Sequence, residues 1–293
     1  MDERTILALV SKRASHFHPD VCRSLDSAFS GVGLTLQFHY IDENSGVAEE
    51  IDRALKSGCH TFLAVGGDGT VSLAAGHLHG KPHRLGIIPA GTANTLARIL
   101  GIPMNIGRAI KLAATSQKTR SIDGMEVRGR LCLQNVSTGI SSISLDGLDA
   151  RQKAQAGMFS YVIGAARATW RIAPCDYKIT IDGRDYAVNA VEIHVTNTGV
   201  LGVPQYHIHE SSCIDDGSVE VLGITRWTPQ KIADTVLDIT LRRKKRAIQF
   251  IGGGSDIRIR SAHGLAVQGD GDIIGTTPVD ITVRPRAVNF IVR

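Results

Sequence analysis

Two glycine-rich loops, each between a short apolar strand and a helical segment, constrain the fold of this chain most. Residues 61–65 (TFLAV) run into a first loop at 66–70 (GGDGT), and residues 85–88 (LGII) run into a second loop at 89–94 (PAGTAN). Strands that alternate with helices in this way form a parallel sheet, and ligands bind at the carboxyl ends of its strands. The sequence therefore predicts that the two loops lie side by side and form one broad ligand site.

The two loops have the chemistry of a phosphate site, although a tight turn without a ligand is the alternative for the first. Glycine lets the backbone approach a phosphate closely, and the N–H groups of a helix N-terminus attract anions. Asp68 would repel phosphate unless Mg²⁺ lies between them. The spacing matches neither the P-loop nor G-x-G-x-x-G, which disfavours Walker-type ATPases and Rossmann dehydrogenases. The residues expected to line a nucleotide site are Gly66, Gly67, Asp68, Gly69, Thr70, Gly91, Thr92 and Asn94.

Length and charge narrow the class of protein. A chain of 293 residues is long enough for two domains. Its net charge of +5 and pI near 9.0 favour an anionic partner, which is a nucleotide, nucleic acid or an anionic membrane surface. No apolar run reaches the roughly 18 residues of a membrane span. The five cysteines form no C-x-x-C pair, which favours a reducing cytoplasm over a disulfide framework or a zinc cluster.

The chain divides into two halves with different periodicity. We expect residues 1–122 to form a nucleotide-binding α/β domain and residues 123–293 to form a β-rich domain, with the last strand free to return to the first. Strands are expected at 5–10, 34–39, 61–65, 85–88, 123–129, 130–136, 177–181, 185–196, 218–225, 257–261 and 279–284, with helices at 150–171 and 229–241. The predicted fold is a parallel α/β domain and an antiparallel β-sandwich-like domain with a cleft between them.

The two loops together resemble the diacylglycerol kinase catalytic domain family, which includes bacterial lipid kinases and the sphingosine and ceramide kinases. Residues 101–103 (GIP), 215–217 (DDG) and 270–272 (DGD) occur in the family's order. The resemblance implies an ATP-dependent lipid kinase that uses Mg²⁺ to transfer the γ-phosphate to a hydroxyl of diacylglycerol or a related lipid. Because GGDGT also occurs in NAD kinases, a kinase with a soluble substrate stays open.

The resemblance also implies roles for several carboxylates. Asp270 or Asp272 would accept the proton of the attacking hydroxyl, and Asp68 would position the catalytic Mg²⁺. Asp216, with the backbone carbonyls of Cys213 and Ser218, would hold a structural Mg²⁺. An Asp-Gly pair is also the strongest short signal for a hairpin turn, which is the alternative for both later motifs.

The chain departs from the family pattern at two places. The family's Asn-Pro and Ser-Gly pairs after the first strand are absent, and residues 10–15 (VSKRAS) stand instead. Two interpretations of Lys12, Arg13 and Ser15 stay open: they contact phosphate in place of the missing pairs, or they belong to a solvated loop. Asp272 replaces the usual Glu and shortens the reach by one methylene. A catalytically impaired nucleotide- or lipid-binding homologue therefore stays open.

Basic residues gather at 242–246 (RRKKR), directly after the predicted helix 229–241. This run predicts either peripheral contact with an anionic membrane or a solvated helix end. Nucleic acid is not expected, because no aromatic residues interleave the run. We expect a cytoplasmic, peripherally membrane-associated protein, and the sequence leaves a homodimer open. His77, His79 and His83 lack metal-ligand spacing and are predicted to lie at the surface.

Overall fold

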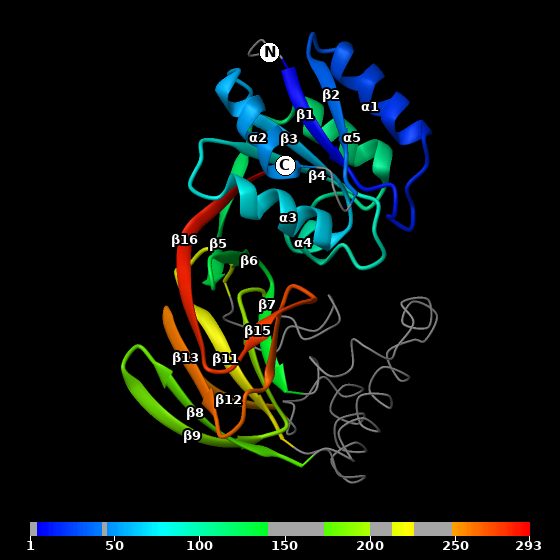
Figure 1. The fold of residues 1–293 in the computed structure, drawn as a ribbon. Coiled ribbons are helices and arrows are strands. Elements are labelled where there is room, and N and C mark those ends of the chain that lie inside the picture. The colour runs from blue at the N-terminus through cyan, green and yellow to red at the C-terminus, as the bar shows by residue number, and fades with distance from the viewer. Residues whose placement is uncertain (1–4, 43–45, 140–172, 200–212, 226–247) are drawn as a thin grey trace. The chain divides into compact units, whose positions relative to one another are not determined.

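The computed structural model describes residues 5–42, 46–139, 173–199, 213–225 and 248–293, and it divides the chain into two compact units. The first unit contains Met1–Gly124 and Pro285–Arg293, and the second contains Met125–Arg284 (Figure 1). The predicted helices at 150–171 and 229–241 and the basic run 242–246 lie outside the described residues. Within the described part of the chain, no helix has the length and apolar content needed to cross a membrane.

The first unit is built on a parallel sheet whose inner strands are mostly buried and apolar. Its order is β2 (Thr35–Tyr40), β1 (Thr5–Val10), β3 (Thr61–Gly66) and β4 (Arg84–Pro89). β16 (Val279–Ile291) joins β4 in parallel, with Phe290 opposite Leu85. Strands buried on both faces carry continuous apolar runs, which is why Leu7–Val10 and Phe62–Val65 are hydrophobic without alternation. The predicted parallel α/β domain is confirmed.

Helices cover both faces of this sheet. α1 (Asp20–Ser30) and α5 (Ile106–Thr115) pack together on one face, and α2 (Val47–Lys56) and α3 (Asp68–Leu78) pack together on the other (Figure 1). α4 (Thr95–Ile99) is a short helix directly after the second glycine loop. α2 buries Val47, Ile51 and Ala54, which recur at helical spacing.

The second unit contains two packed antiparallel layers. One is a six-stranded sheet, and the other contains the first part of β16 and three further strands, with a short hairpin of β5 and β6 beside it. The six-stranded sheet has the order β12 (Ile248–Gly254), β11 (Val219–Ile224), β10 (Glu192–Thr196), β7 (Asn135–Gly139), β14 (Ala266–Gly269) and β15 (Asp272–Thr276). The other layer has the order β16, β13 (Asp256–Ser261), β8 (Cys175–Ile181) and β9 (Arg184–Ala190), and the hairpin joins β5 (Thr119–Val127) to β6 (Arg130–Cys132).

The core of the second unit lies between these layers and is mostly aliphatic. Ile179 and Ile181 of β8 and Ile193 and Val195 of β10 are buried in one cluster. Each pair stands two residues apart on its strand, so alternate residues point into the core and the others point away from it. This arrangement confirms the predicted antiparallel β-sandwich-like domain.

Four sequence predictions need correction. The expected strand at 130–136 is two strands, β6 and β7, which belong to different sheets and are separated by Leu133 and Gln134. The expected strand at 185–196 is two strands, β9 and β10, which belong to different layers and are separated at Val191. The strand expected at 279–284 continues to Ile291. His83, which was expected at the surface, is buried. Its ring is satisfied there, because Nδ1 bonds the Lys81 carbonyl at 2.7 Å and Nε2 accepts the Asn289 N–H at 3.1 Å. Burial lowers the pKa of His83.

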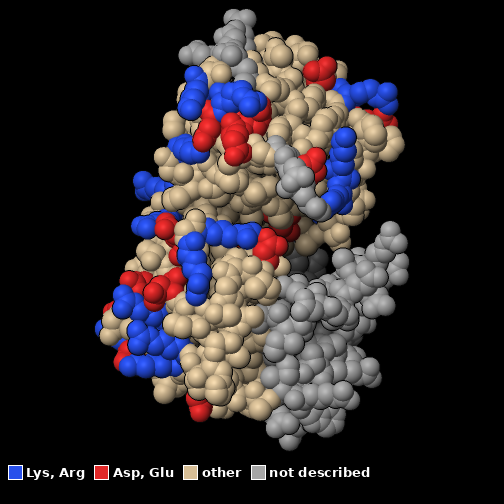
Figure 2. Space-filling model, in the orientation of Figure 1, with Lys and Arg blue, Asp and Glu red and all other residues tan. Residues whose placement is uncertain are grey.

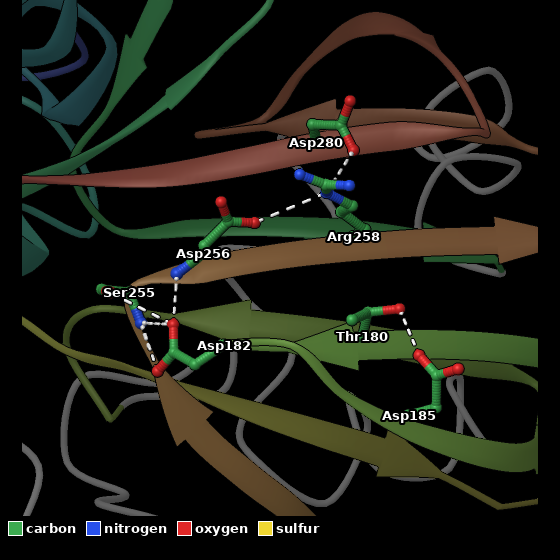
Figure 3. Close-up of polar contacts among 7 residues, drawn as sticks. All are labelled: Thr180, Asp182, Asp185, Ser255, Asp256, Arg258 and Asp280. Atoms are coloured by element: carbon green, nitrogen blue, oxygen red, sulfur yellow. Dashed lines mark hydrogen bonds and ion pairs between the residues drawn. The ribbon is translucent and has the colours of Figure 1, made fainter.

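The outer face of β8, β9 and β13 is charged with both signs. Figure 2 shows Lys and Arg interspersed with Asp and Glu over these strands. The Lys178 ammonium lies 2.7 Å from the Asp185 carboxylate, and the Arg258 guanidinium lies 3.6 Å from Asp256 and 3.7 Å from Asp280 (Figure 3). Paired charges of this kind keep an exposed sheet face soluble but add little stability.

Candidate active site

The strand order of the first unit defines the place where a ligand can bind. The chain leaves β1 on one side to form β2 and returns on the other side of β1 to form β3. Two neighbouring strands whose connections run to opposite sides leave a crevice at their carboxyl ends. The loops after β1, β3 and β4 all begin at this edge of the sheet.

The first glycine loop brings β3 directly into α3. Gly67 precedes the helix in an extended conformation, and Asp68 is the first helical residue. The Thr70 side chain packs against Gly66 so closely that a Cβ at position 66 would overlap it. Glycine at 66 is therefore required by packing. The N-terminus of α3 lies at the carboxyl end of β3, where its N–H groups and dipole would stabilise an anion.

The second glycine loop is held together by its own asparagine. The Gly91 N–H donates to Asn94 Oδ1 at 3.1 Å, and Asn94 Nδ2 donates back to the Gly91 carbonyl at 2.6 Å. Asn94 is buried and has a positive φ of 48°, a conformation that asparagine tolerates better than most residues. The side chain of Asn94 thus shapes this loop, and its predicted role in nucleotide binding stays a prediction.

The two glycine loops lie side by side, as the sequence predicts. Gly66 is paired with Pro89, and the Ala90 N–H donates to the Gly66 carbonyl at 2.9 Å. Gly67 and Gly91 approach so closely that a Cβ at Gly67 would stand 3.2 Å from the Gly91 Cα. Both glycines are therefore needed for the contact between the loops.

Asp68 links the first loop to the helix that comes after the second. Its Oδ2 accepts the Thr95 N–H at 3.0 Å, and its Oδ1 accepts the Leu96 N–H at 3.1 Å. These are the first N–H groups of α4, which have no partner within that helix. Asp68 is therefore a structural link as well as the residue expected to position Mg²⁺.

A third loop, after β1, completes this edge of the sheet. Ser15 Oγ lies 3.0 Å from Thr92 Oγ1, and His16 bonds the Gly91 carbonyl at 3.0 Å through Nδ1. The Lys12 ammonium stands 4.1 Å from the centre of the Tyr40 ring at the end of β2, a cation–π contact. The chain thus places Ser15 and Lys12 near the expected nucleotide site without the family's Asn-Pro and Ser-Gly residues.

In the second unit, Asp270 lies in a two-residue turn between β14 and β15, and its carboxylate accepts hydrogen bonds from backbone N–H groups. Its Oδ2 accepts the Leu133 N–H at 2.7 Å, and its Oδ1 accepts the N–H groups of Gln134 and Asn135 at 2.9 and 3.1 Å. Three backbone donors on one carboxylate hold the segment between β6 and β7 in place. Little of this carboxylate is left for a substrate hydroxyl.

Asp272 has a different environment, although it is only two residues away. Its side chain is 65% exposed, and its carboxylate forms an ion pair with Arg130. An exposed pair of this kind is weak and exchanges readily. Of the two predicted proton acceptors, Asp272 is therefore the one whose oxygens are accessible to a substrate hydroxyl.

The predicted structural Mg²⁺ site lies in an exposed turn. Asp216 Oδ1 accepts the Ser218 N–H at 3.0 Å, and both Cys213 and Asp216 are exposed. No group of three or more His, Cys, Asp or Glu residues that could hold a metal occurs among the described residues. One carboxylate with backbone carbonyls remains suitable chemistry for Mg²⁺, which prefers oxygen ligands.

Comparison with known proteins identifies the family. Residues 8–127 match the family model of the diacylglycerol kinase catalytic domain, and residues 134–292 match that of the YegS C-terminal NAD kinase beta sandwich-like domain. The chain belongs to this lipid kinase family. The two glycine loops thus lie in the diacylglycerol kinase catalytic domain, and Asp270, Asp272 and Asp216 lie in the YegS-type domain.

Relatives and solved structures agree with this assignment. The chain is 26% identical over 263 residues to a probable lipid kinase YegS-like of Enterobacter sp. (strain 638), covering 88% of this chain and 86% of the relative. It is 28% identical over 262 residues to the probable lipid kinase YegS of Escherichia coli (strain K12 / DH10B), covering 87% and 86%. A putative diacylglycerol kinase from Bacillus anthracis str. Sterne has the same fold, with a TM-score of 0.80 at 24% identity over 99% of this chain and 95% of that one.

Some residues at the strand edge are not predicted from the sequence. His16 contacts the second glycine loop, yet no motif in the sequence singles it out. The available signal is position, because any segment directly after β1 must lie at the switch point of the sheet.

Proposed function

We propose that this lipid kinase transfers the γ-phosphate of ATP to a hydroxyl of diacylglycerol or a related lipid. Membership of a kinase family implies ATP as the phosphoryl donor. The observation that supports the nucleotide site most is the meeting of three loops, after β1, β3 and β4, at the switch point of the parallel sheet. Asp272 belongs to the second unit, so the proposal assigns nucleotide binding to the first unit and acceptor chemistry to the second.

The nucleotide phosphates are assigned to backbone N–H groups at the start of α3. Gly66, Gly67 and Gly69 give the close approach, and the hydroxyls of Thr70 and Thr92 are additional donors. Ser15 and Lys12 take the place of the family's Asn-Pro and Ser-Gly segment. Gly91 and Asn94 keep the second loop in the shape that presents Thr92.

The chemical step requires one proton acceptor. The lipid hydroxyl oxygen attacks the γ-phosphorus, the bond from that phosphorus to the β–γ bridging oxygen breaks, and ADP leaves. The hydroxyl proton passes to the Asp272 carboxylate, which is exposed and forms a solvent-accessible ion pair with Arg130.

The oxygen donors present suit Mg²⁺, which when bound would neutralise phosphate charge. Asp68 retains lone pairs beyond the two that accept the N–H groups of Thr95 and Leu96. We assign Asp68 to the Mg²⁺ that accompanies the nucleotide, and Asp216 with the carbonyls of Cys213 and Ser218 to a structural Mg²⁺.

We further propose a cytoplasmic enzyme that contacts anionic membrane surfaces through the basic run 242–246. That run supplies five adjacent cations, each worth about 1 kcal/mol near an anionic surface. A homodimer is compatible with this assignment, and light scattering of the purified chain decides between monomer and dimer.

The test is transfer of labelled phosphate from Mg-ATP to an extracted lipid pool by the purified chain, with products identified by mass spectrometry. A labelled lipid supports the proposal, whereas NADP formation without lipid, or ATP binding with no turnover on any acceptor, would overturn it. Asp68→Asn separates the two roles of Asp68, since loss of a metal role raises the Mg²⁺ concentration needed for half-maximal rate. Loss of the structural role alone lowers the melting temperature and leaves that concentration unchanged.

A further inference from the structure

β2 forms the edge of the parallel sheet of the first unit, and none of its six residues is buried (Figure 1). By contrast, β1, β3 and β4 each have five buried residues of six. Large exposed apolar side chains stand near both ends of β2. Val32, three residues before it, is 48% exposed, and Tyr40, its last residue, is 41% exposed. The edge of β2 is therefore both accessible and apolar.

Other sheet edges carry features that block pairing with another chain, and β2 carries none. Proteins usually block an edge strand with charged residues, a bulge or proline. The edge strand β9 contains Arg184 and Asp185. Both edges of the six-stranded sheet are bulged, because the pairing skips Ile251 in β12 and Ile274 in β15. β2 has no charge and no proline, and it pairs with β1 without interruption over Thr35–Tyr40. Of these four edges, β2 alone is unprotected.

One hydrogen bond fixes the direction of the backbone groups of β2. The Ile41 N–H, directly after the strand, donates to the Val10 carbonyl at 2.8 Å, so it points toward β1. Backbone groups of successive residues in a strand point to alternate sides. The N–H and C=O groups of Leu36, Phe38 and Tyr40 therefore point away from β1, and no described strand pairs with them.

These outward groups allow the strand to pair with a second copy of itself. A two-fold axis through the sheet at Phe38 gives an antiparallel pair in which Phe38 faces its own copy and Leu36 faces Tyr40. Each facing pair exchanges two hydrogen bonds, so every outward group finds a partner. Moving the register toward the start of the strand would require the Leu34 N–H, which already donates to the Phe29 carbonyl at 3.0 Å.

The side chains of this register also match. The Tyr40 hydroxyl lies 3.9 Å from Cys22 Sγ of α1, so Tyr40 lies on the α1 side of the sheet. Leu36 and Phe38 share that side, because they precede Tyr40 at steps of two. The axis thus brings two phenylalanines together and places a leucine against a tyrosine on either side of them. Apolar and aromatic cross-strand pairs stabilise sheets, and no like charges oppose this pairing.

We infer that β2 is a dimer interface, at which two copies of this chain join their parallel sheets through antiparallel β2 strands. At about one hydrogen bond per 100–200 Å² of interface, the bonds of this register correspond to about 600–1,200 Å², the lower end for a specific complex. The dimer should therefore dissociate on dilution. The inference goes beyond the proposed function, because it uses none of the residues assigned to phosphoryl transfer.

The first test is the mass of the purified chain in solution. Light scattering from about 1 to about 100 µM, a range that covers weak interfaces, should show a mass that rises from 31.4 kDa toward twice that value. A chain that stays monomeric over this range would leave the edge to a strand of another protein and would overturn the inference.

Phe38→Lys places two cations face to face at the axis and should weaken the dimer at least about 100-fold. Phe250→Lys is the matched control, since Phe250 is a phenylalanine, 48% exposed, on the bulged edge strand β12. It should leave the dissociation constant within about twofold. A dimer that persists in Phe38→Lys, or is lost in Phe250→Lys, overturns the inference. Tyr40→Lys, at a more exposed position of the same register, replaces Phe38→Lys if that variant does not fold.

Disulfide trapping tests the register. Facing residues of a hydrogen-bonded antiparallel pair have Cα atoms about 5.5 Å apart, which a disulfide can span. Phe38→Cys treated with diamide should form a covalent dimer, with the 38–38 peptide identified by mass spectrometry. Thr35→Cys is the control, because position 35 and its copy would lie about 20 Å apart. A dimer without the 38–38 link, or one with a 35–35 link, overturns the inference.

Discussion

Two Asp-Gly turns of the second unit share one backbone structure and differ in the residue that comes next in the chain. Asp182 and Gly183 join β8 to β9 with φ of 45° and 81°, and Asp270 and Gly271 join β14 to β15 with φ of 49° and 99°. Positive φ at both positions is the signature of the tight hairpin turn that suits the twist of paired strands.

In both turns the aspartate binds the backbone of a distant segment. The Asp182 carboxylate accepts the N–H groups of Ser255 and Asp256 at 3.0 and 2.9 Å (Figure 3). Asp270 does the same for the segment that begins at Leu133. The residue after the turn differs, since it is Arg184 in one and Asp272 in the other. The turn aspartate is therefore a structural residue in both places, and chemistry is assigned to Asp272.

Asp272→Asn should have the largest effect. Without a proton acceptor we expect kcat to fall about 100- to 10,000-fold with the melting temperature unchanged. Asp272→Glu, which restores the family's usual residue, should keep most of the activity. The control is Asp185→Asn, another exposed, ion-paired aspartate. A fully active Asp272→Asn variant would show that another group accepts the hydroxyl proton. The residue after the turn would then have no catalytic role in either turn.

Asp270→Ala should lower the free energy of unfolding by about 3 kcal/mol, because three backbone N–H groups lose their acceptor. Urea unfolding of the full chain measures this loss. Asp280→Asn, whose carboxylate lies 3.7 Å from Arg258 on an exposed surface, is the control and should change stability by less than about 0.5 kcal/mol. A stable but inactive Asp270→Ala would instead place the chemistry on Asp270.

Asp182→Ala should cost less, about 1 kcal/mol, because this turn is exposed and its interactions are screened. The N–H of Asp256, with smaller contributions from the Ser255 N–H and hydroxyl, lowers the pKa of Asp182, while burial opposes the shift. The stabilisation is complete above the ordinary Asp pKa of about 3.9 and is lost as pH falls through the folded-state value. Unfolding at pH 7 should separate the variant from wild type, and unfolding near pH 2 should not. A difference that persists at low pH would contradict this assignment.

Gly183→Ala and Gly271→Ala should have small and nearly equal effects. A Cβ at either position meets nothing within 4 Å, so the cost is the positive φ alone, about 1 kcal/mol. Thermal melting of both variants measures it. Markedly unequal losses would show that the two turns are not equivalent.

Much of this fold is predictable from the sequence, because its main signals are local. The loops 66–70 and 89–94 each lie between a strand and a helix, and the Asp182–Gly183 pair predicts its hairpin. β12 is not predicted, since three of its seven residues are glycine, which is disfavoured in strands. α1 is not predicted either, and its buried face of Val21, Leu25 and Phe29 is visible only once it packs.

The site is less predictable, because its key contacts join residues far apart in the chain. Residue type and motif point to Asp68, yet its bonds to Thr95 and Leu96 depend on the approach of two loops. The motif 270–272 does not tell Asp270 from Asp272, and only the three N–H groups on Asp270 do so. Burial of His83 and His194 depends on tertiary packing, which no local pattern of the sequence contains.

β16 has a consequence for the order of folding. It starts in the second unit, and its final residues complete the first, where Phe290 pairs with Leu85 and the Val292 N–H donates to the Lys118 carbonyl at 3.1 Å. A ribosome delivers these residues after the whole β-rich unit. The parallel sheet of the first unit is therefore incomplete, with one side of β4 unpaired, until the β-rich unit has been synthesised. This one strand thus makes the two units mature cooperatively, rather than letting the first mature alone.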